Sequence, residues 1–201
     1  MAAKAPAVVM THGLNCVKEI LFPKVARRFQ DFGYNALIYD SRNIGESDGL
    51  PRNHINPMLE CEDILDIVTH VSSLPHVDSK NIILWGASLG ATESGCAAAM
   101  DPRIKAVVMV CPIFSFFQQD KMEKVLQQLI KDRQSQLRGN EAFSVPPYNS
   151  KGESPTGIGG SGGPGGLELY NLMTAIGSRA SPNHRNRMTL QTYLKTLSIP
   201  T

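Results

Sequence analysis

The stretch that decides the fold is residues 81–95, NIILWGASLGATESG. It opens with an apolar run, residues 82–85, of the length and composition expected for a strand that is buried on both faces. The pentapeptide GASLG follows without a gap, so the pattern G-x-S-x-G stands where the strand would turn into a helix. Such a turn strains the backbone of its serine, and strand and helix can approach only if the flanking positions are small, as Gly86 and Gly90 are. Ser88 is therefore expected at the tip of the turn.

Two interpretations of this serine follow from the pattern. In the first, the Ser88 hydroxyl is exposed above the carboxyl ends of the strands and acts as a catalytic nucleophile. In the second, it only caps the helix at the end of a glycine-rich turn. The buried strand before it and the helix of small residues after it favour the nucleophile, and the N–H of Leu89 then becomes a candidate oxyanion donor.

The composition is that of an ordinary globular protein. The chain has 201 residues, 42% of them hydrophobic, with a formal net charge of +2. The charges are interspersed, so neither nucleic acid nor a membrane surface is an expected partner. The four cysteines are far apart without metal-ligand spacing, and neither a metal nor another cofactor is expected. With no signal sequence, transmembrane run or peroxisomal tripeptide in the sequence, a cytoplasmic location is expected.

A second strand end carries candidate site residues. The apolar run at residues 7–10 leads into Thr11, His12, Gly13 and Leu14. After such a strand, the backbone N–H that follows the glycine, here that of Leu14, is expected to pair with the N–H of Leu89 as an oxyanion hole. His12 and Gly13 would lie beside the substrate, and His12 is expected to fix the loop rather than to act as a base. The alternative is an ordinary turn between a strand and a helix.

The rest of the first half alternates between strand and helix patterns. Further strands are expected at residues 36–39 and 104–110, and helices at 17–32, from Pro57 and at 91–100. This alternation predicts an α/β fold with a mostly parallel sheet and right-handed crossover helices.

The alternation ends after residue 113. A long amphipathic helix, a Gly/Pro-rich loop at about 145–166 and two further helical pieces predict an all-helical lid. We therefore expect one structural domain, with a core at 1–113 and a lid at 114–201. Three aromatic residues just past the last strand either line an apolar acyl pocket or belong to the core: Phe114, Phe116 and Phe117. The G-x-G-x-x-G pattern at 157–162 lacks a preceding strand, so no dinucleotide site is expected there.

Longer blocks identify a family. The blocks are THGLNCVKE, YDSRNIGESDGLPRN, LWGASLGATESGCAAAMDPRIKAVVMVCP, and SQLRGNEAF with GIGGSGGPGG. Together they resemble the fungal α/β-hydrolases of secondary-metabolite clusters, the polyketide transferases and toxin-biosynthesis hydrolases. The resemblance implies an enzyme that forms an acyl intermediate on Ser88, with Leu14 and Leu89 as oxyanion donors. Its substrate would be an acyl or polyketide thioester or ester, delivered by a polyketide synthase, which it hydrolyses or transfers to an alcohol.

The sequence departs from the family pattern in its catalytic triad. In this fold an acid and a histidine follow the serine on late strands after the lid, and these strands are not found in the sequence. His184 is the only histidine after Ser88, so it is the candidate base, although the resemblance assigns its segment to the lid. Four acidic residues fall in the same region: Asp132, Glu141, Glu153 and Glu168. Two hypotheses follow: an active serine acyl hydrolase or transferase, or a family member, shortened at both ends, that is inactive or only binds ligand.

Overall fold

The computed structural model describes residues 4–114, 118–160, 162–179 and 181–197. Contacts between residues divide the chain into two compact units. The first unit comprises Met1–Ser41 and Pro57–Ile113, and the second comprises Arg42–Asn56 and Phe114–Thr201. Residues 42–56 thus belong to the same unit as the residues after 113. The boundaries of core and lid that the sequence led us to expect stay a prediction.

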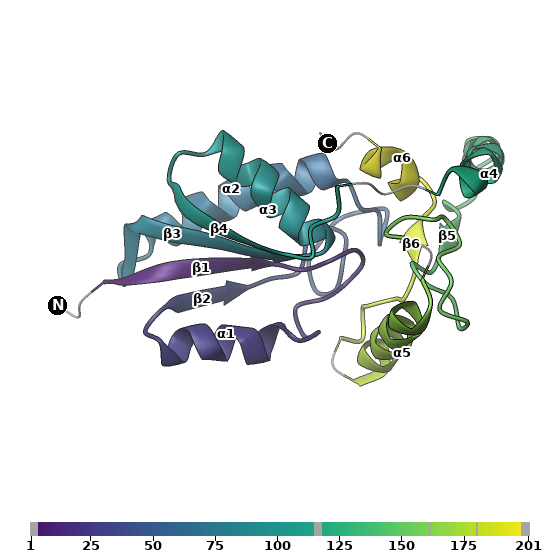
Figure 1. The fold of residues 1–201 in the computed structure, drawn as a ribbon. Coiled ribbons are helices and arrows are strands. Elements are labelled where there is room, and N and C mark those ends of the chain that lie inside the picture. Colours follow the sequence, from purple (N-terminus) through teal and green to yellow (C-terminus); the bar gives the residue numbers. More distant parts are fainter. Residues whose placement is uncertain (1–3, 115–117, 161, 180, 198–201) are drawn as a thin grey trace. The chain divides into compact units, whose positions relative to one another are not determined.

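The first unit contains a four-stranded parallel sheet, which confirms the predicted parallel α/β arrangement. Its strands are β1 (Ala5–Thr11), β2 (Asn35–Ile38), β3 (Val77–Ala87) and β4 (Ile104–Val110). The strand order is β2-β1-β3-β4, with β1 in the middle between β2 and β3 (Figure 1). Because the strands are parallel, the carboxyl ends of β1 and β3 meet at the same edge of the sheet.

Helices cover both faces of this sheet. Helix α1 (Phe22–Asp31) lies on one face, while α2 (Pro57–Ser73) and α3 (Leu89–Met100) lie on the other (Figure 1). Successive side chains of β1 point to opposite faces of the sheet. Val8 packs in the hydrophobic cluster that contains Phe22 of α1, and Val9 packs in the cluster that contains Ile64 of α2. Burial on both faces explains why β1 reads as a continuous apolar run, whereas Val108 and Val110 of the edge strand β4 are exposed.

Helix α1 begins later than its sequence pattern predicts. The apolar spacing indicated a helix over 17–32, whereas α1 starts at Phe22. Leu21 has a positive φ of 66°, and Pro23 lies in the first turn, where its missing N–H costs no helical hydrogen bond. A proline at this position sets the start of the helix, so the predicted first turns were wrong.

Strand β3 and helix α3 approach each other closely at their junction. Ser88, between the two elements, has φ 56° and ψ −122°, a conformation that L-residues rarely adopt. A β-carbon at Gly86 would collide with the backbone of Gly90, and one at Gly90 with the carbonyl oxygens of Thr11 and His12. Both glycines are therefore needed for strand and helix to approach, as the sequence predicted.

Helix α3 also buries a carboxyl group. Glu93 is 1% exposed, and neither of its carboxyl oxygens has a hydrogen-bond partner among the residues that the structure describes. Burial raises the pKa of Glu93 well above its usual value of 4.5, and the negative field of Glu60 on α2 adds to this shift. The carboxyl is thus favoured in its protonated form.

The second unit is not all-helical, which corrects the sequence-based expectation. Besides α4 (Gln119–Leu137), α5 (Pro164–Arg179) and α6 (Thr192–Thr196), it contains β5 (Ser144–Val145) and β6 (Met188–Thr189), which pair antiparallel. Strands of two residues are too short to show a period of two in the sequence, and their pairing joins distant segments. Among the described residues of both units, no helix has the length and apolar character to cross a membrane.

The first prediction concerns Gly90. Replacing it by alanine forces a β-carbon against two carbonyl oxygens of the neighbouring loop, so the Gly90→Ala protein should lose about 1–3 kcal/mol of stability. Thermal unfolding followed by circular dichroism measures this loss. Gly165→Ala is the matched control, because nothing lies within 4 Å of the added carbon there. An unchanged melting temperature for Gly90→Ala would contradict the tight junction.

The second prediction concerns Glu93. Because its pKa in the folded state is raised, the stabilising protonated state is complete below pH 4.5 and is lost as the pH rises towards the raised pKa. Glutamine does not ionise, so the Glu93→Gln protein should not lose this stability as the pH rises. The melting temperature of the variant minus that of the parent protein should therefore increase by at least ~3 °C between pH 5 and pH 8. Glu62→Gln, an exposed change on α2, should show no such trend. A pH-independent difference for Glu93→Gln would refute the interpretation.

Candidate active site

The loop after β1 lies directly against Ser88. A β-carbon added at Gly13 would be 3.1 Å from Ser88 Cβ, 3.3 Å from the Ala87 carbonyl oxygen and 3.6 Å from Ser88 Oγ. Gly13 therefore leaves open the space beside the serine hydroxyl. The structure brings together these two predicted site residues, which are 75 positions apart in the chain, because their strands are neighbours in the sheet.

Two backbone N–H groups at this edge donate to no backbone carbonyl oxygen of the described residues. Among the described residues, no backbone hydrogen bond has the N–H of Leu14 or Leu89 as its donor. Leu89 is the first residue of α3, so its N–H belongs to the first turn, which has no partner within the helix, at the positive end of the helix dipole. Two such donors beside a serine hydroxyl can stabilise negative charge that develops on a carbonyl oxygen.

His12 is a buried neighbour of this loop. It is 3% exposed; its Nδ1–H donates to the Gly13 carbonyl oxygen at 3.1 Å, and its Nε2 accepts the Ser41 N–H at 3.2 Å. Burial lowers the pKa of His12 below 6.5, so the ring is favoured in its neutral form. With both ring nitrogens engaged by the backbone, His12 has the contacts of a loop-fixing residue.

The contact between His12 and Gly13 also orients the candidate donor. The Gly13 carbonyl and the Leu14 N–H belong to one planar trans peptide, in which they point in opposite directions. The Gly13 oxygen accepts hydrogen bonds from His12 and from the Cys16 N–H, the latter at 3.0 Å. The hydrogen bonds to the Gly13 carbonyl oxygen fix the orientation of this peptide plane. They therefore also fix the direction of the Leu14 N–H on the opposite side of the peptide.

A partly buried ion pair ties down the same loop, and sequence reasoning missed it. The Asp40 carboxylate, just after β2, accepts the backbone N–H of Lys18 at 2.8 Å and its Nζ at 2.5 Å. Asp40 is 6% exposed. Both residues lie in sequence blocks that resemble the family, and the only signal for their pairing is that they follow neighbouring parallel strands.

Two more of the predicted site residues, His184 and Phe114, belong to the second unit. His184 is buried, and its backbone N–H donates to the Ser181 carbonyl oxygen at 2.9 Å. Its role as a base stays a prediction. Phe114 is 57% exposed, and Phe116 and Phe117 lie outside the described residues. Within the described part of the chain, no group of three His, Cys, Asp or Glu side chains is placed to hold a metal ion.

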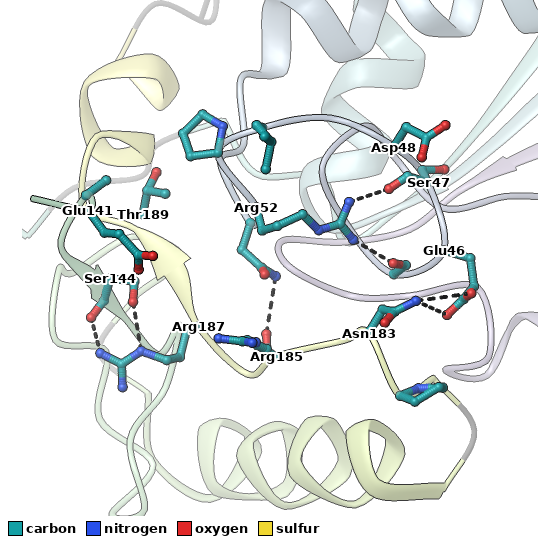
Figure 2. Close-up of a pocket in the computed structure, with 16 residues that line it drawn as sticks. Glu46, Ser47, Asp48, Arg52, Glu141, Ser144, Asn183, Arg185, Arg187 and Thr189 are labelled. Carbon is teal, nitrogen blue, oxygen red and sulfur yellow. Dashed lines mark hydrogen bonds between the residues drawn. The ribbon is translucent and has the colours of Figure 1, made fainter. Parts of the chain in front are cut away.

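The second unit also contains a polar cavity of about 890 Å³ that sequence analysis did not identify (Figure 2). The Arg52 guanidinium donates to the carbonyl oxygens of Gly45 and Ser47 and so folds the loop 45–52 on itself. Arg187 holds Ser144 in the same way, across the small sheet. Acidic and basic side chains occur in equal number in its lining: Glu46, Asp48, Glu141, Arg52, Arg185 and Arg187.

Comparison with known proteins agrees with this architecture. Residues 2–151 match the family model Hydrolase_4, described as serine aminopeptidase, S33. A thiohydrolase from Eupenicillium brefeldianum is 39% identical over 197 residues, which cover 98% of this chain and 63% of the relative. The polyketide transferase GrgF from Penicillium is 35% identical over 97% of this chain and 64% of the relative.

Two solved structures extend the similarity to the fold. The complex of DcsB with its substrate analogue superposes with a TM-score of 0.92 at 59% identity, over 97% of this chain and 66% of that one. The crystal structure of GrgF, an α/β-hydrolase from Penicillium sp. sh18, gives a TM-score of 0.81 at 35% identity, over 98% and 65%. The chain thus spans slightly less than two thirds of these relatives. By its family match and its fold, the chain belongs to the α/β-hydrolase family described as serine aminopeptidase, S33.

Proposed function

We propose that this chain is a serine-dependent acyl hydrolase or acyl transferase with Ser88 as its nucleophile. Its substrate would be a polyketide or other acyl thioester or ester of fungal secondary metabolism, delivered by a polyketide synthase. The observation that carries the proposal is the geometry at Ser88. A serine in a left-handed strand-to-helix turn lies beside Gly13, next to a loop that carries the Leu14 N–H, and the Leu89 N–H follows it directly.

Each residue has a step in the proposed reaction. Ser88 Oγ attacks the acyl carbonyl carbon and gives its proton to a base, and the N–H groups of Leu14 and Leu89 bind the oxyanion that forms. The intermediate collapses, the bond to the thiol or alcohol breaks, and the leaving group takes the proton. Water or an acceptor alcohol then attacks the Ser88 ester, which releases an acid or a new ester and restores the hydroxyl. A serine hydroxyl at its ordinary pKa is a weak nucleophile and therefore needs a base to accept its proton. His184 is the candidate for this base.

The names of the relatives support the substrate class. Thiohydrolases and polyketide transferases of fungi are similar to this chain along nearly its whole length. Both names describe acyl chemistry at a carbonyl carbon, one with a thioester cleaved and the other with a polyketide passed on. A single acyl-enzyme on Ser88 accommodates both outcomes, because only the second nucleophile differs.

The third prediction tests the nucleophile. A fluorophosphonate probe should label the folded chain once, at Ser88, because the phosphoryl oxygen takes the place of the oxyanion. Intact-mass spectrometry and peptide mapping measure the site and the rate. Ser88→Ala should abolish labelling, whereas Ser47→Ala, a change in the cavity of the second unit, should leave the rate unchanged. If the folded protein is not labelled, the chain is not an active serine enzyme by itself, and the competing hypothesis of an inactive, ligand-binding protein is favoured.

The fourth prediction concerns His12 as a positioning residue. His12→Ala should lower the labelling rate of Ser88 by about tenfold or more, because removing an oriented oxyanion donor costs ~2.7–4 kcal/mol in known enzymes and His12 acts on such a donor indirectly. For the parent protein, the rate should fall as the pH drops below 6.5 through the lowered pKa of His12, since protonated Nε2 cannot accept the Ser41 N–H.

The control for this variant is His76→Ala, an exposed histidine of the same unit. Thermal unfolding of both variants separates a loss of stability from a loss of rate. A His12→Ala protein that reacts at the parent rate would refute the positioning role, whatever its melting temperature.

A further inference from the structure

A second, smaller cavity lies within the second unit and shares only Ser144 with the lining of the polar one. It has a volume of about 360 Å³, within the usual range for a small-molecule site. Part of the lining is a single face of α4, because Lys121 is three residues from Lys124 and four from Val125, and Gln128 is four and three residues further on. The rest comes from β5 and other segments of the second unit, with Phe143, Val145, Pro155 and Leu190 among the lining residues. We call this space the α4 groove.

The α4 groove has the character of an amphiphile site. Five of its lining residues are apolar, and its only charged residues, Lys121 and Lys124, lie one turn apart on α4. None of the lining residues is acidic, in contrast to the polar cavity, where the signs balance. The groove therefore presents an apolar interior with positive charge on one wall.

The two lysines differ in their contacts. Lys121 Nζ donates to the Ser154 carbonyl oxygen at 2.7 Å, which fixes the segment that precedes Pro155. Lys124 makes neither an ion pair nor a side-chain hydrogen bond with any described residue. Its ammonium charge is thus available to an anion at the groove.

A buried polar atom in the lining lacks a partner as well. Thr156 is 2% exposed, and its Oγ1 has no hydrogen-bond partner among the described residues. A ligand with an acceptor oxygen that reached this hydroxyl would remove the cost of leaving it unsatisfied. Thr156 is thus a second candidate donor, besides Lys124, for an oxygen-rich head group.

We propose that the α4 groove is a binding site for an amphipathic carboxylate, with the aliphatic or aromatic chain against Val125, Phe143 and Leu190 and the carboxylate at Lys124. The charge of the groove selects an anion over a cation, and its apolar lining selects an acid with a hydrocarbon body over acetate or inorganic anions. All lining residues of the groove belong to the second unit, and the proposal does not depend on catalysis at Ser88.

Titration calorimetry with decanoate, below its critical micelle concentration, tests the proposal. One decanoate should bind per chain, at least tenfold more tightly than methyl decanoate, and decyltrimethylammonium should not bind. Lys124→Gln should weaken the binding of decanoate at least fivefold and leave the affinity for methyl decanoate unchanged. Lys131→Gln, the matched control on the same helix outside the groove, should have no effect.

Two further variants make the result decisive. Gln128→Trp should fill the groove and abolish binding, while Ser88→Ala should bind decanoate as the parent does, which separates this site from the proposed acyl-enzyme chemistry. Circular dichroism confirms that each variant is folded. Equal affinity for the acid and its ester, an unaffected Lys124→Gln protein, or loss of binding in Ser88→Ala would overturn the proposal. So would sedimentation showing a dimer that Gln128→Trp dissociates, because a second copy would then occupy the groove.

Discussion

The close contact of α3 with the end of β1 is the constraint on which the rest of the first unit depends. Gly90 lies against the carbonyl oxygens of Thr11 and His12, and Gly86 lies against the backbone of Gly90, so no side chain fits at either glycine. This approach forces Ser88 into a left-handed conformation and presents the first turn of α3 at the edge of the sheet. The strained backbone conformation of Ser88 is thus maintained by the close packing at Gly86 and Gly90 on either side of it.

The same close packing also buries polar side chains further along α3. Its second turn is buried together with its polar side chains, and only some of them find partners there. Thr92 Oγ1 donates to the Ile113 carbonyl oxygen at 2.8 Å and accepts the Ile113 N–H at 3.0 Å. Among the described residues Glu93 has no such partner, and its burial favours the protonated form by raising its pKa. A helix that could sit further from the sheet would not bury a carboxyl in this way.

Sequence predicted best what depends on local pattern. The four strands and the turn at Ser88 follow from short apolar runs and two glycines, and the structure has them where they were expected. What depends on contacts between distant segments was missed. The Lys18–Asp40 pair joins two loops, β5 pairs with β6 across more than forty residues, and the Thr189 N–H donates to the Asn53 carbonyl oxygen. No periodicity in a single sequence records such pairings, so both cavities of the second unit were found only in the structure.

In the proposed mechanism, Ser88 Oγ reacts while the N–H groups of Leu14 and Leu89 hold the oxyanion. A crystal structure of the chain after reaction with a fluorophosphonate would show whether they do. We expect a phosphonyl group on Ser88 Oγ, a positive φ at residue 88, and the phosphoryl oxygen within ~3.1 Å of both backbone nitrogens. A phosphonyl group on another residue, or a phosphoryl oxygen directed away from Leu14 and Leu89, would contradict it.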